Sequence, residues 1–376
     1  MNRKHEIIYR FIRPIASALL YFKFKYRKEM AENLPENYIV VANHLTNWDS
    51  LFVATAFKKQ MYFVASEHLA RQKYFPVVNA LLKPIIRRKG TKAVSTVKEV
   101  IKVTRKGGNV AIFAEGDRCW DGISCPIMPA TGKMIKSAKC GMVTYRLEGG
   151  FFLNPRWSMT MRKGYVAGKM GKVYTKEQVA AMSPEEINEA LARDLFEDAY
   201  VTQEKVQCAY KGKRLAEGME NLLFYCPECG KMDSFISEED TVTCRECGHS
   251  FRYTEYGMLE GTKFDTIRDF SLWQQQKASD DARSGAAYTS ETAKLVEIDM
   301  DHNEVFAAEG AVYLDKDKLV CGSEEFLMED IVELAIHSRS CIVFTANKKY
   351  YEMRAPERVN VYKLTLLYNE YKKMQK

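Results

Sequence analysis

Apolar and polar residues follow two alternating patterns over residues 30–210. Short apolar runs, typical of buried strands, occur in YIVVANH, KKQMYFVAS, NVAIFAEG and GMVTYRLEGGF. The segment TKAVSTVKEVIKVTRKGG has apolar residues at helical spacing and ends in a Gly pair, which predicts a helix and its end. Further along, TKEQ and SPEE have the form of capping boxes and predict the starts of two more helices. Strands that alternate with helices predict an α/β domain with a mainly parallel sheet.

The pattern changes after this domain. Residues 221–256 are polar and cysteine-paired, and the small polar residues 277–292, KASDDARSGAAYTSET, predict a linker. Residues 293–376 contain several β-rich runs and then PERVNVYKLTLLYNEYKKMQK, which predicts a closing amphipathic helix that begins at Pro356. This order of elements loosely resembles a pleckstrin-homology-like module, which would contact lipid or a protein partner. A dimerisation or packing domain is the alternative.

Basic charge is concentrated at the N-terminus. The formal net charge of the 376 residues is +7, and residues 1–30 hold eight Lys and Arg against two Glu, a difference of +6. Residues 1–29 therefore predict a basic amphipathic segment that binds an anionic surface, either lipid or nucleic acid. A first helix packed on the core is the alternative interpretation.

The compartment is predicted from what the sequence contains and lacks. No run approaches the roughly 20 apolar residues that span a bilayer, and no small-residue cleavage site indicates a signal peptide. Four of the ten cysteines form CxxC pairs and the others are scattered, which fits a reducing compartment. We expect a cytoplasmic protein that is peripheral on the inner face of the membrane.

The first predicted strand leads into a candidate catalytic pair. Asn43 and His44 follow the strand directly, and Asp49 lies just over one helical turn further on. The carboxylate can accept a hydrogen bond from one ring nitrogen, which fixes the tautomer and leaves the other nitrogen free to take a proton. Asn43 would help to shape the pocket. Taken alone, a histidine at the end of a strand is more often a packing residue.

Two further loops carry candidate anion-binding residues. Glu115, Gly116 and Arg118 follow another apolar strand, so they are expected at the same edge of the sheet as His44. Glycine lets the backbone approach a ligand, and arginine offers a fork that suits phosphate or carboxylate. The segment KPIIRRKG adds Arg88. Together these residues predict a site that holds an anion and deprotonates a group beside it.

These motifs resemble a known family. Three segments are similar to the first three motifs of the glycerolipid acyltransferases, which include the 1-acylglycerol-3-phosphate acyltransferases. They are Asn43-His44-x4-Asp49, the block around Arg88, and Phe113-x-Glu115-Gly116-x-Arg118. The resemblance covers roughly residues 30–205.

The resemblance implies an O-acyltransferase at the membrane surface. It would move a fatty acyl group from acyl-CoA or acyl-carrier protein to a hydroxyl of a lysophospholipid or a related glycerol-containing acceptor. His44 would be the general base and Asp49 its orienting partner. Arg88, Glu115 and Arg118 would hold the acceptor's head group.

Five positions depart from the family pattern. In the motif around Glu115, Ala114, Asp117 and Cys119 stand where the family commonly has Pro, Thr and Ser. Elsewhere, Thr144 stands where the family usually has Pro, and Arg87 where it often has Asp. Asp117 places a negative charge beside Arg118, which would weaken anion binding unless its side chain points away. These departures leave the acceptor open. Asp117, Cys119 and Thr144 also motivate an alternative in which the chain is a catalytically inactive lipid-binding adaptor.

Two CxxC pairs, each followed by Gly and separated by fourteen residues, predict a zinc ribbon with a closed, structural Zn²⁺ site. Its ligands would be Cys226, Cys229, Cys244 and Cys247. The stretch between the two pairs is acidic, which favours a brace between domains or a protein-docking surface. For that reason nucleic acid is the partner we least expect.

Overall fold

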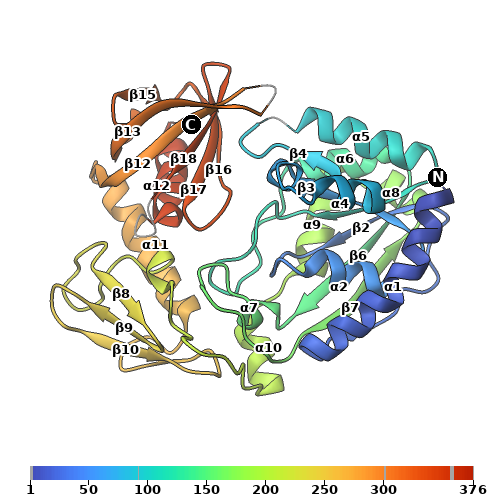
Figure 1. The fold of residues 1–376 in the computed structure, drawn as a ribbon, viewed down its shortest axis with the longest axis horizontal. Coiled ribbons are helices and arrows are strands. Elements are labelled where there is room, and N and C mark those ends of the chain that lie inside the picture. The colour runs from blue at the N-terminus through green and yellow to red at the C-terminus, as the bar shows by residue number, and fades with distance from the viewer. Residues whose placement is uncertain (1–2, 92, 300–301, 356–359, 376) are drawn as a thin grey trace. The chain divides into compact units, whose positions relative to one another are not determined.

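The computed structural model describes residues 3–91, 93–299, 302–355 and 360–375 (Figure 1). The chain folds as two compact units. The first contains both the basic N-terminal segment and the predicted α/β domain, and the second contains the cysteine pairs and the β-rich C-terminal region. The first unit comprises Met1–Arg87, Ala93–Arg156 and Met161–Gly212, and the second comprises Arg88–Lys92, Trp157–Thr160 and Lys213–Lys376.

The first unit is built on a seven-stranded sheet with the order β1-β7-β6-β2-β5-β3-β4. Each neighbouring pair is parallel except β6 and β7, so the predicted mainly parallel sheet is confirmed. The four strands predicted from the sequence are β2, β3, β5 and β6. The strand bounds are β1 (Arg27–Lys28), β2 (Tyr38–Ala42), β3 (Met61–Ser66), β4 (Ile85–Arg87), β5 (Asn109–Phe113), β6 (Gly141–Glu148) and β7 (Ala167–Tyr174).

Two helices of this unit begin where the sequence predicts capping boxes. Thr175 and Ser183 each accept a hydrogen bond from a main-chain N–H three residues later and complete the two capping boxes. The helix bounds are α1 (Arg3–Phe24), α2 (Asp49–Ala56), α3 (Glu67–Ala70), α4 (Phe75–Leu82), α5 (Val94–Arg105), α6 (Ala130–Ala138), α7 (Gly150–Leu153), α8 (Lys176–Ala181), α9 (Pro184–Leu195) and α10 (Ala199–Val206). Among the described helices, none combines the length and the apolar character needed to cross a bilayer.

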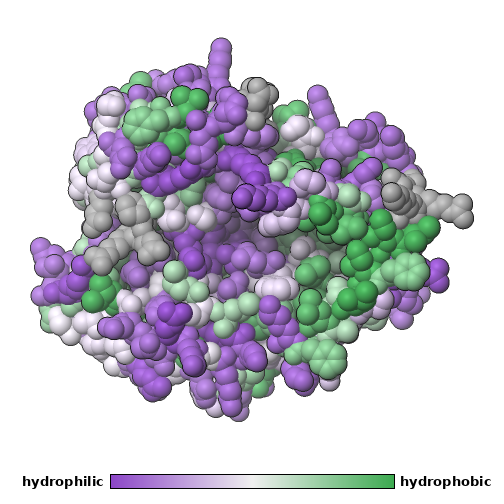
Figure 2. All heavy atoms as spheres, in the orientation of Figure 1, coloured by the Kyte–Doolittle hydropathy of each residue, from purple (hydrophilic) through white to green (hydrophobic). Residues whose placement is uncertain are grey.

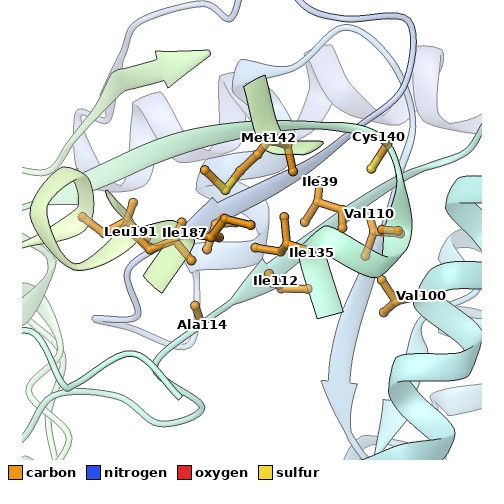
Figure 3. Close-up of a cluster of buried hydrophobic side chains, with 14 of the residues drawn as sticks. Ile39, Val100, Val110, Ile112, Ala114, Ile135, Cys140, Met142, Ile187 and Leu191 are labelled. Carbon is orange, nitrogen blue, oxygen red and sulfur yellow. The ribbon is translucent and has the colours of Figure 1, made fainter. Parts of the chain in front are cut away.

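Alternate residues of β2 serve the two layers of helices that cover the sheet. Ile39 and Val41 pack toward α5, α6 and α9 in a fully buried cluster (Figure 3). Tyr38 points to the opposite face, where its ring centroid lies 6.0 Å from that of Phe57, just after α2. Because both faces of the sheet are covered, β2 is buried along its length. The next residue along the chain whose side chain reaches solvent is His44, just after the strand.

The second unit contains two antiparallel sheets. The first, after the first cysteine pair in the chain, has four strands in the order β11-β10-β9-β8. The second, later in the chain, has seven strands in the order β15-β14-β13-β12-β18-β17-β16. The strands are β8 (Phe235–Glu238), β9 (Thr241–Cys244), β10 (Ser250–Tyr253), β11 (Leu259–Glu260), β12 (Tyr288–Ile298), β13 (Glu304–Leu314), β14 (Lys318–Cys321), β15 (Glu324–Leu327), β16 (Ile331–Ile336), β17 (Cys341–Ala346) and β18 (Lys349–Arg354).

Helix α12 (Val361–Met374) packs on β16 and β17, so the predicted β-rich region closed by a helix is confirmed. The first helical residue is Val361, and the predicted start at Pro356 lies outside the described residues.

The linker predicted over residues 277–292 is corrected by the structure. Helix α11 (Ile267–Arg283) runs through its first half, and β12 begins at Tyr288. The small polar composition hid a helix that buries Ala278 and Ala282 on one side. Pairs four residues apart, such as Lys277 with Asp281, also support the helix.

Candidate active site

The ends of β2 and β5 bring His44 and Glu115 together. The two strands are parallel, and Ala42 pairs with Phe113 in their last rung. His44 and Glu115 each follow two residues later, and the main-chain N–H of His44 donates to Oε1 of Glu115 at 3.0 Å. The main-chain N–H of Cys125 donates to the other oxygen, Oε2, at 2.7 Å. The Glu115 carboxyl group therefore joins the end of β2 to the loop after β5.

Burial raises the pKa of Glu115 to about 8, although the N–H donors of Cys125 and His44 act to lower it. The carboxyl group is therefore largely protonated at neutral pH. A protonated carboxyl group adds little negative charge at the end of β2 beside His44.

Asp49 orients the imidazole of His44. Nδ1 of His44 lies 2.8 Å from Oδ2 of Asp49. The same oxygen accepts the main-chain N–H groups of Leu45 at 2.6 Å and Thr46 at 2.8 Å, and the Thr46 hydroxyl donates to Oδ1 at 2.6 Å. These hydrogen bonds fix the carboxylate, whose side chain is 1% exposed. A carboxylate at Nδ1 favours the tautomer that carries its hydrogen there.

The opposite side of the His44 ring is accessible. The ring stacks on Phe113, with centroids 4.4 Å apart and an interplanar angle of 19°. The His44 side chain remains 25% exposed, and its Nε2 forms no hydrogen bond to any residue that the structure describes. One ring nitrogen is thus held by a carboxylate, and the other can take a proton from a hydroxyl group.

The turn after β5 closes over the main chain of His44. The N–H of Cys119 donates to the carbonyl oxygen of His44 at 3.2 Å. Gly116 within this turn has a φ of +72°, a conformation that favours glycine. Because Arg118 directly precedes Cys119, this hydrogen bond holds Arg118 close to His44.

Arg118 is a half-buried cation next to Asp117, whose negative charge is balanced by Arg156. Its Nη1 donates to the Asn154 amide oxygen at 3.4 Å. Burial, followed by the charge of Arg156, lowers the pKa of Arg118 to about 10, so it stays protonated at neutral pH. Asp117 forms an ion pair with Arg156, whose guanidinium lies 4.6 Å from the Trp120 ring centroid. Arg156 thus compensates Asp117, the residue expected to weaken anion binding.

The family of the first unit follows from a comparison with protein-family models. Residues 25–148 match the model described as Acyltransferase. These residues belong to the acyltransferase family. The match includes His44, Asp49, Glu115 and Arg118, so the resemblance predicted from the motifs is confirmed at the level of this family.

Two solved structures are similar to parts of the chain. The crystal structure of the 1-acyl-sn-glycerophosphate (LPA) acyltransferase PlsC from Thermotoga maritima has 20% identity and a TM-score of 0.46, and the match covers 55% of this chain and 84% of that one. The solution structure of the N-terminal PH domain of human ARAP2 has 10% identity and a TM-score of 0.18, over 24% of this chain and 84% of that one. No curated protein matches the sequence.

Two other residues predicted for the site, Asn43 and Arg88, form their contacts with other parts of the chain. The buried Asn43 amide donates to the carbonyl of Leu147 at 2.9 Å and accepts from its N–H at 2.7 Å, which extends the pairing of β2 with β6. Arg88 is grouped with the second unit. There its guanidinium lies 3.9 Å from the Tyr350 ring centroid and donates to the Ile298 carbonyl at 3.2 Å.

Three residues of the site were missed in the sequence. Thr46 stands three residues before Asp49, a local spacing typical of side-chain capping, so this signal was available. Phe113 belongs to the motif around Glu115, but nothing in the sequence pattern predicted that its ring would stack on His44. Arg156 lies far along the chain from Asp117, and no local pattern connects the two.

Thr144, one of the departures from the family pattern, fills an irregularity between β6 and β7. The register shifts between Val143 and Tyr145. The Thr144 hydroxyl accepts the N–H of Lys172 at 2.7 Å across this bulge. The departure is thus explained by the local pairing of two strands.

The cysteine quartet of the second unit forms a compact cluster. Its sulfur atoms all lie within 4.8 Å of one another, and they belong to Cys226, Cys229, Cys244 and Cys247. Sγ–Sγ distances of 3.7 and 3.8 Å across the two pairs of loops match the roughly 3.8 Å edge of a tetrahedron with Zn–S bonds of about 2.3 Å. Two similar turns present the sulfurs, with Gly230 and Gly248 each donating its N–H to a cysteine carbonyl at 3.0 Å. The donor set and spacing therefore fit a closed tetrahedral metal site.

Proposed function

We propose that the chain is an O-acyltransferase that moves a fatty acyl group from an acyl thioester to a hydroxyl of a lysophospholipid or a related glycerol-containing acceptor. The observation that supports this most directly is the His44–Asp49 hydrogen bond of 2.8 Å, with Nε2 of the ring open. The Arg118 guanidinium, held on the adjoining turn, would bind an anionic group of the acceptor.

In the proposed reaction, Nε2 of His44 takes the proton of the acceptor hydroxyl while the hydroxyl oxygen bonds to the thioester carbon. The C–S bond then breaks, and the imidazolium returns the proton to the leaving thiolate. Asp49 stabilises the positive charge that His44 carries between these two events. Since a thioester is already activated, one positioned base and an anchored acceptor suffice for transfer.

The test compares two matched histidine variants of the full chain with labelled acyl-CoA or acyl-carrier protein and a panel of lysophospholipids. His44→Asn is expected to lower the rate by about 10²–10⁴-fold, the usual contribution of a general base. His302→Asn, at an exposed histidine of the second unit, should match wild type. Wild-type turnover in His44→Asn would contradict the proposal.

We also propose that the cysteine cluster binds a structural Zn²⁺ ion. All four positions of a tetrahedral ion would be filled by thiolates, which leaves none for a substrate. Such an ion would stabilise the small four-stranded sheet β8–β11, since the sheet's own buried apolar side chains are few, among them Phe235, Val242 and Phe251.

Finally, we propose that the acyltransferase docks peripherally on anionic membrane through α1 and α4. The two helices lie against each other, and Figure 2 shows apolar side chains gathered over them. On α1, Phe11 and Ile15 are 69% and 70% exposed, and on α4, Val77 is 61% exposed. Helix α4 has no buried residue at all. A contiguous apolar surface flanked by basic residues suits a lipid interface.

A further inference from the structure

A basic groove lies within the acyltransferase unit, beside the end of α1. The groove has a volume of about 720 Å³, and it is bounded by residues 22–27, 163–165 and 206–211. None of the residues that line it is acidic. Its five cations are Lys23, Lys25, Arg27, Lys163 and Lys211. Within the part of the chain that the structure describes, none of the five forms an ion pair with a carboxylate.

The backbone places two of these cations side by side. Lys163 and Lys211 stand opposite each other in an antiparallel bridge, joined by main-chain hydrogen bonds of 2.9 and 2.8 Å. Residues directly opposite in such a bridge project to the same side, and like charges at these positions destabilise the fold. Gly164 packs against the ring of Tyr210: a Cβ at position 164 would lie 2.3 Å from a carbon of that ring. An anion in the groove would relieve this repulsion.

The groove adjoins the catalytic motif. Nζ of Lys23 lies 4.0 Å from the ring centroid of Trp48, the residue just before Asp49, and the ring of Phe24 lies 5.1 Å from Trp48. On the other wall, the Tyr165 hydroxyl donates to Glu148 at 3.4 Å. A ligand held here is therefore next to the His44–Asp49 segment.

We propose that this groove binds the phosphates of the CoA moiety of an acyl-CoA donor, an inference that rests on the proposed function. Its volume lies within the roughly 300–1,000 Å³ of small-molecule and cofactor sites. CoA carries phosphates on both sides of its ribose, which suits cations spread over three segments of chain. The exposed ring of Phe22, together with Tyr165, offers a surface for the adenine. The thioester end of the donor would extend past Trp48 toward His44.

Direct binding of adenosine 3′,5′-bisphosphate to the full chain tests this without any turnover. Lys163→Glu/Lys211→Glu is expected to weaken binding by about tenfold or more in calorimetry, because two cations become anions at the phosphate site. Lys58→Glu/Lys133→Glu makes the same change of net charge at exposed lysines outside the groove and should bind as wild type does. In activity assays, the groove variant should raise the KM for acyl-CoA and leave the KM for the acceptor unchanged.

Equal bisphosphate binding by wild type and the groove variant, or no binding by wild type, would overturn the inference while leaving the acyltransferase proposal intact. Bisphosphate binding that depends on Lys163 and Lys211 in a protein without transfer activity would instead defeat the proposed function alone. Vesicles containing phosphatidylglycerol provide a further arm. If the groove variant loses vesicle binding but keeps bisphosphate binding, the groove is a lipid site and the inference is wrong. Lys163→Gln/Lys211→Gln, which removes charge without reversing it, should show an intermediate affinity.

Discussion

The buried guanidinium of Arg156 pairs with the carboxylate of Asp117, the residue that precedes Arg118. Arg156 is 3% exposed and also donates to the carbonyl of Arg118 at 3.4 Å. Asp117 departs from the family pattern and would place a negative charge beside Arg118, but Arg156, from a distant segment of the chain, balances this charge. The pair leaves Arg118 free to carry the positive charge of the site.

Removing this compensation should weaken both the fold and acceptor binding. Arg156→Met leaves the Asp117 charge without its partner, which is expected to destabilise the protein by roughly 1–3 kcal/mol and to raise the KM for an anionic acceptor. Adding Asp117→Asn should restore part of both losses, because the unpaired charge is removed. Thermal unfolding and steady-state kinetics on the four proteins of this cycle measure the effect. Simple additivity of the two substitutions would show that the pair is not coupled.

Asp49→Asn should separate orientation of the imidazole from substrate binding. The amide replaces one accepting oxygen of Asp49, which receives hydrogen bonds from His44, Leu45 and Thr46. We expect kcat to fall by about 10²-fold or more, with a small change in KM. Asp265→Asn, at an exposed aspartate of the second unit, is the control. An unchanged kcat in Asp49→Asn would remove Asp49 from the mechanism.

Glu115 should make the stability of the protein decrease as pH rises. Burial raises its pKa from 4.5 to about 8. Between these two values the unfolded chain releases the proton while the folded protein keeps it, so the free energy of unfolding falls with increasing pH and levels off above about pH 8. Glu115→Gln should flatten this slope in urea denaturation between pH 5.5 and 8. Burial also raises the pKa of Glu197, to about 7, so a slope below pH 7 should remain.

Zinc content should depend on the cysteine cluster alone. Cys247→Ser replaces an exposed ligand and is expected to lower bound zinc from about one ion per chain to a small fraction, together with a lower unfolding temperature. Cys208→Ser, at a half-buried cysteine outside the cluster, should keep the ion. Metal analysis by mass spectrometry after dialysis provides the measurement, and a zinc-free wild-type protein purified in zinc-supplemented medium would contradict the proposal.

Membrane binding is best tested by substitution on the exposed face of α1. Deleting the helix would also remove Leu20 and Phe24, which are 0% and 2% exposed and belong to the core. Phe11→Ser/Ile15→Ser should lower co-sedimentation with anionic vesicles by at least about tenfold, since each large apolar side chain transferred from water contributes roughly 1.5–3 kcal/mol. Phe306→Ser, at a residue 61% exposed in the second unit, is the matched control. Equal sedimentation of all three proteins would argue against this surface.

Part of the site could be predicted because its signals are local. The distance from His44 to Asp49 in the sequence is just over one helical turn, and the hydrogen bond between them is the result. The proximity of His44 to Glu115 followed from a general property of parallel strands, whose carboxyl ends share one edge of the sheet. In contrast, the helix that runs through residues 277–283 was hidden by its small polar residues, because its stability depends on packing of one face in the second unit.

The alternation of strands and helices in the first unit, the His44–Asp49 pair and the two cysteine pairs could be predicted from the sequence alone, since each depends on periodicity or on spacing along a few turns of chain. The placement of charged side chains relative to one another came from the tertiary structure: Arg156 pairs with Asp117, Arg88 is grouped with the second unit, and Lys163 stands opposite Lys211. Such pairings join segments far apart along the chain, and their partners are selected by how the sheet and its loops pack in space.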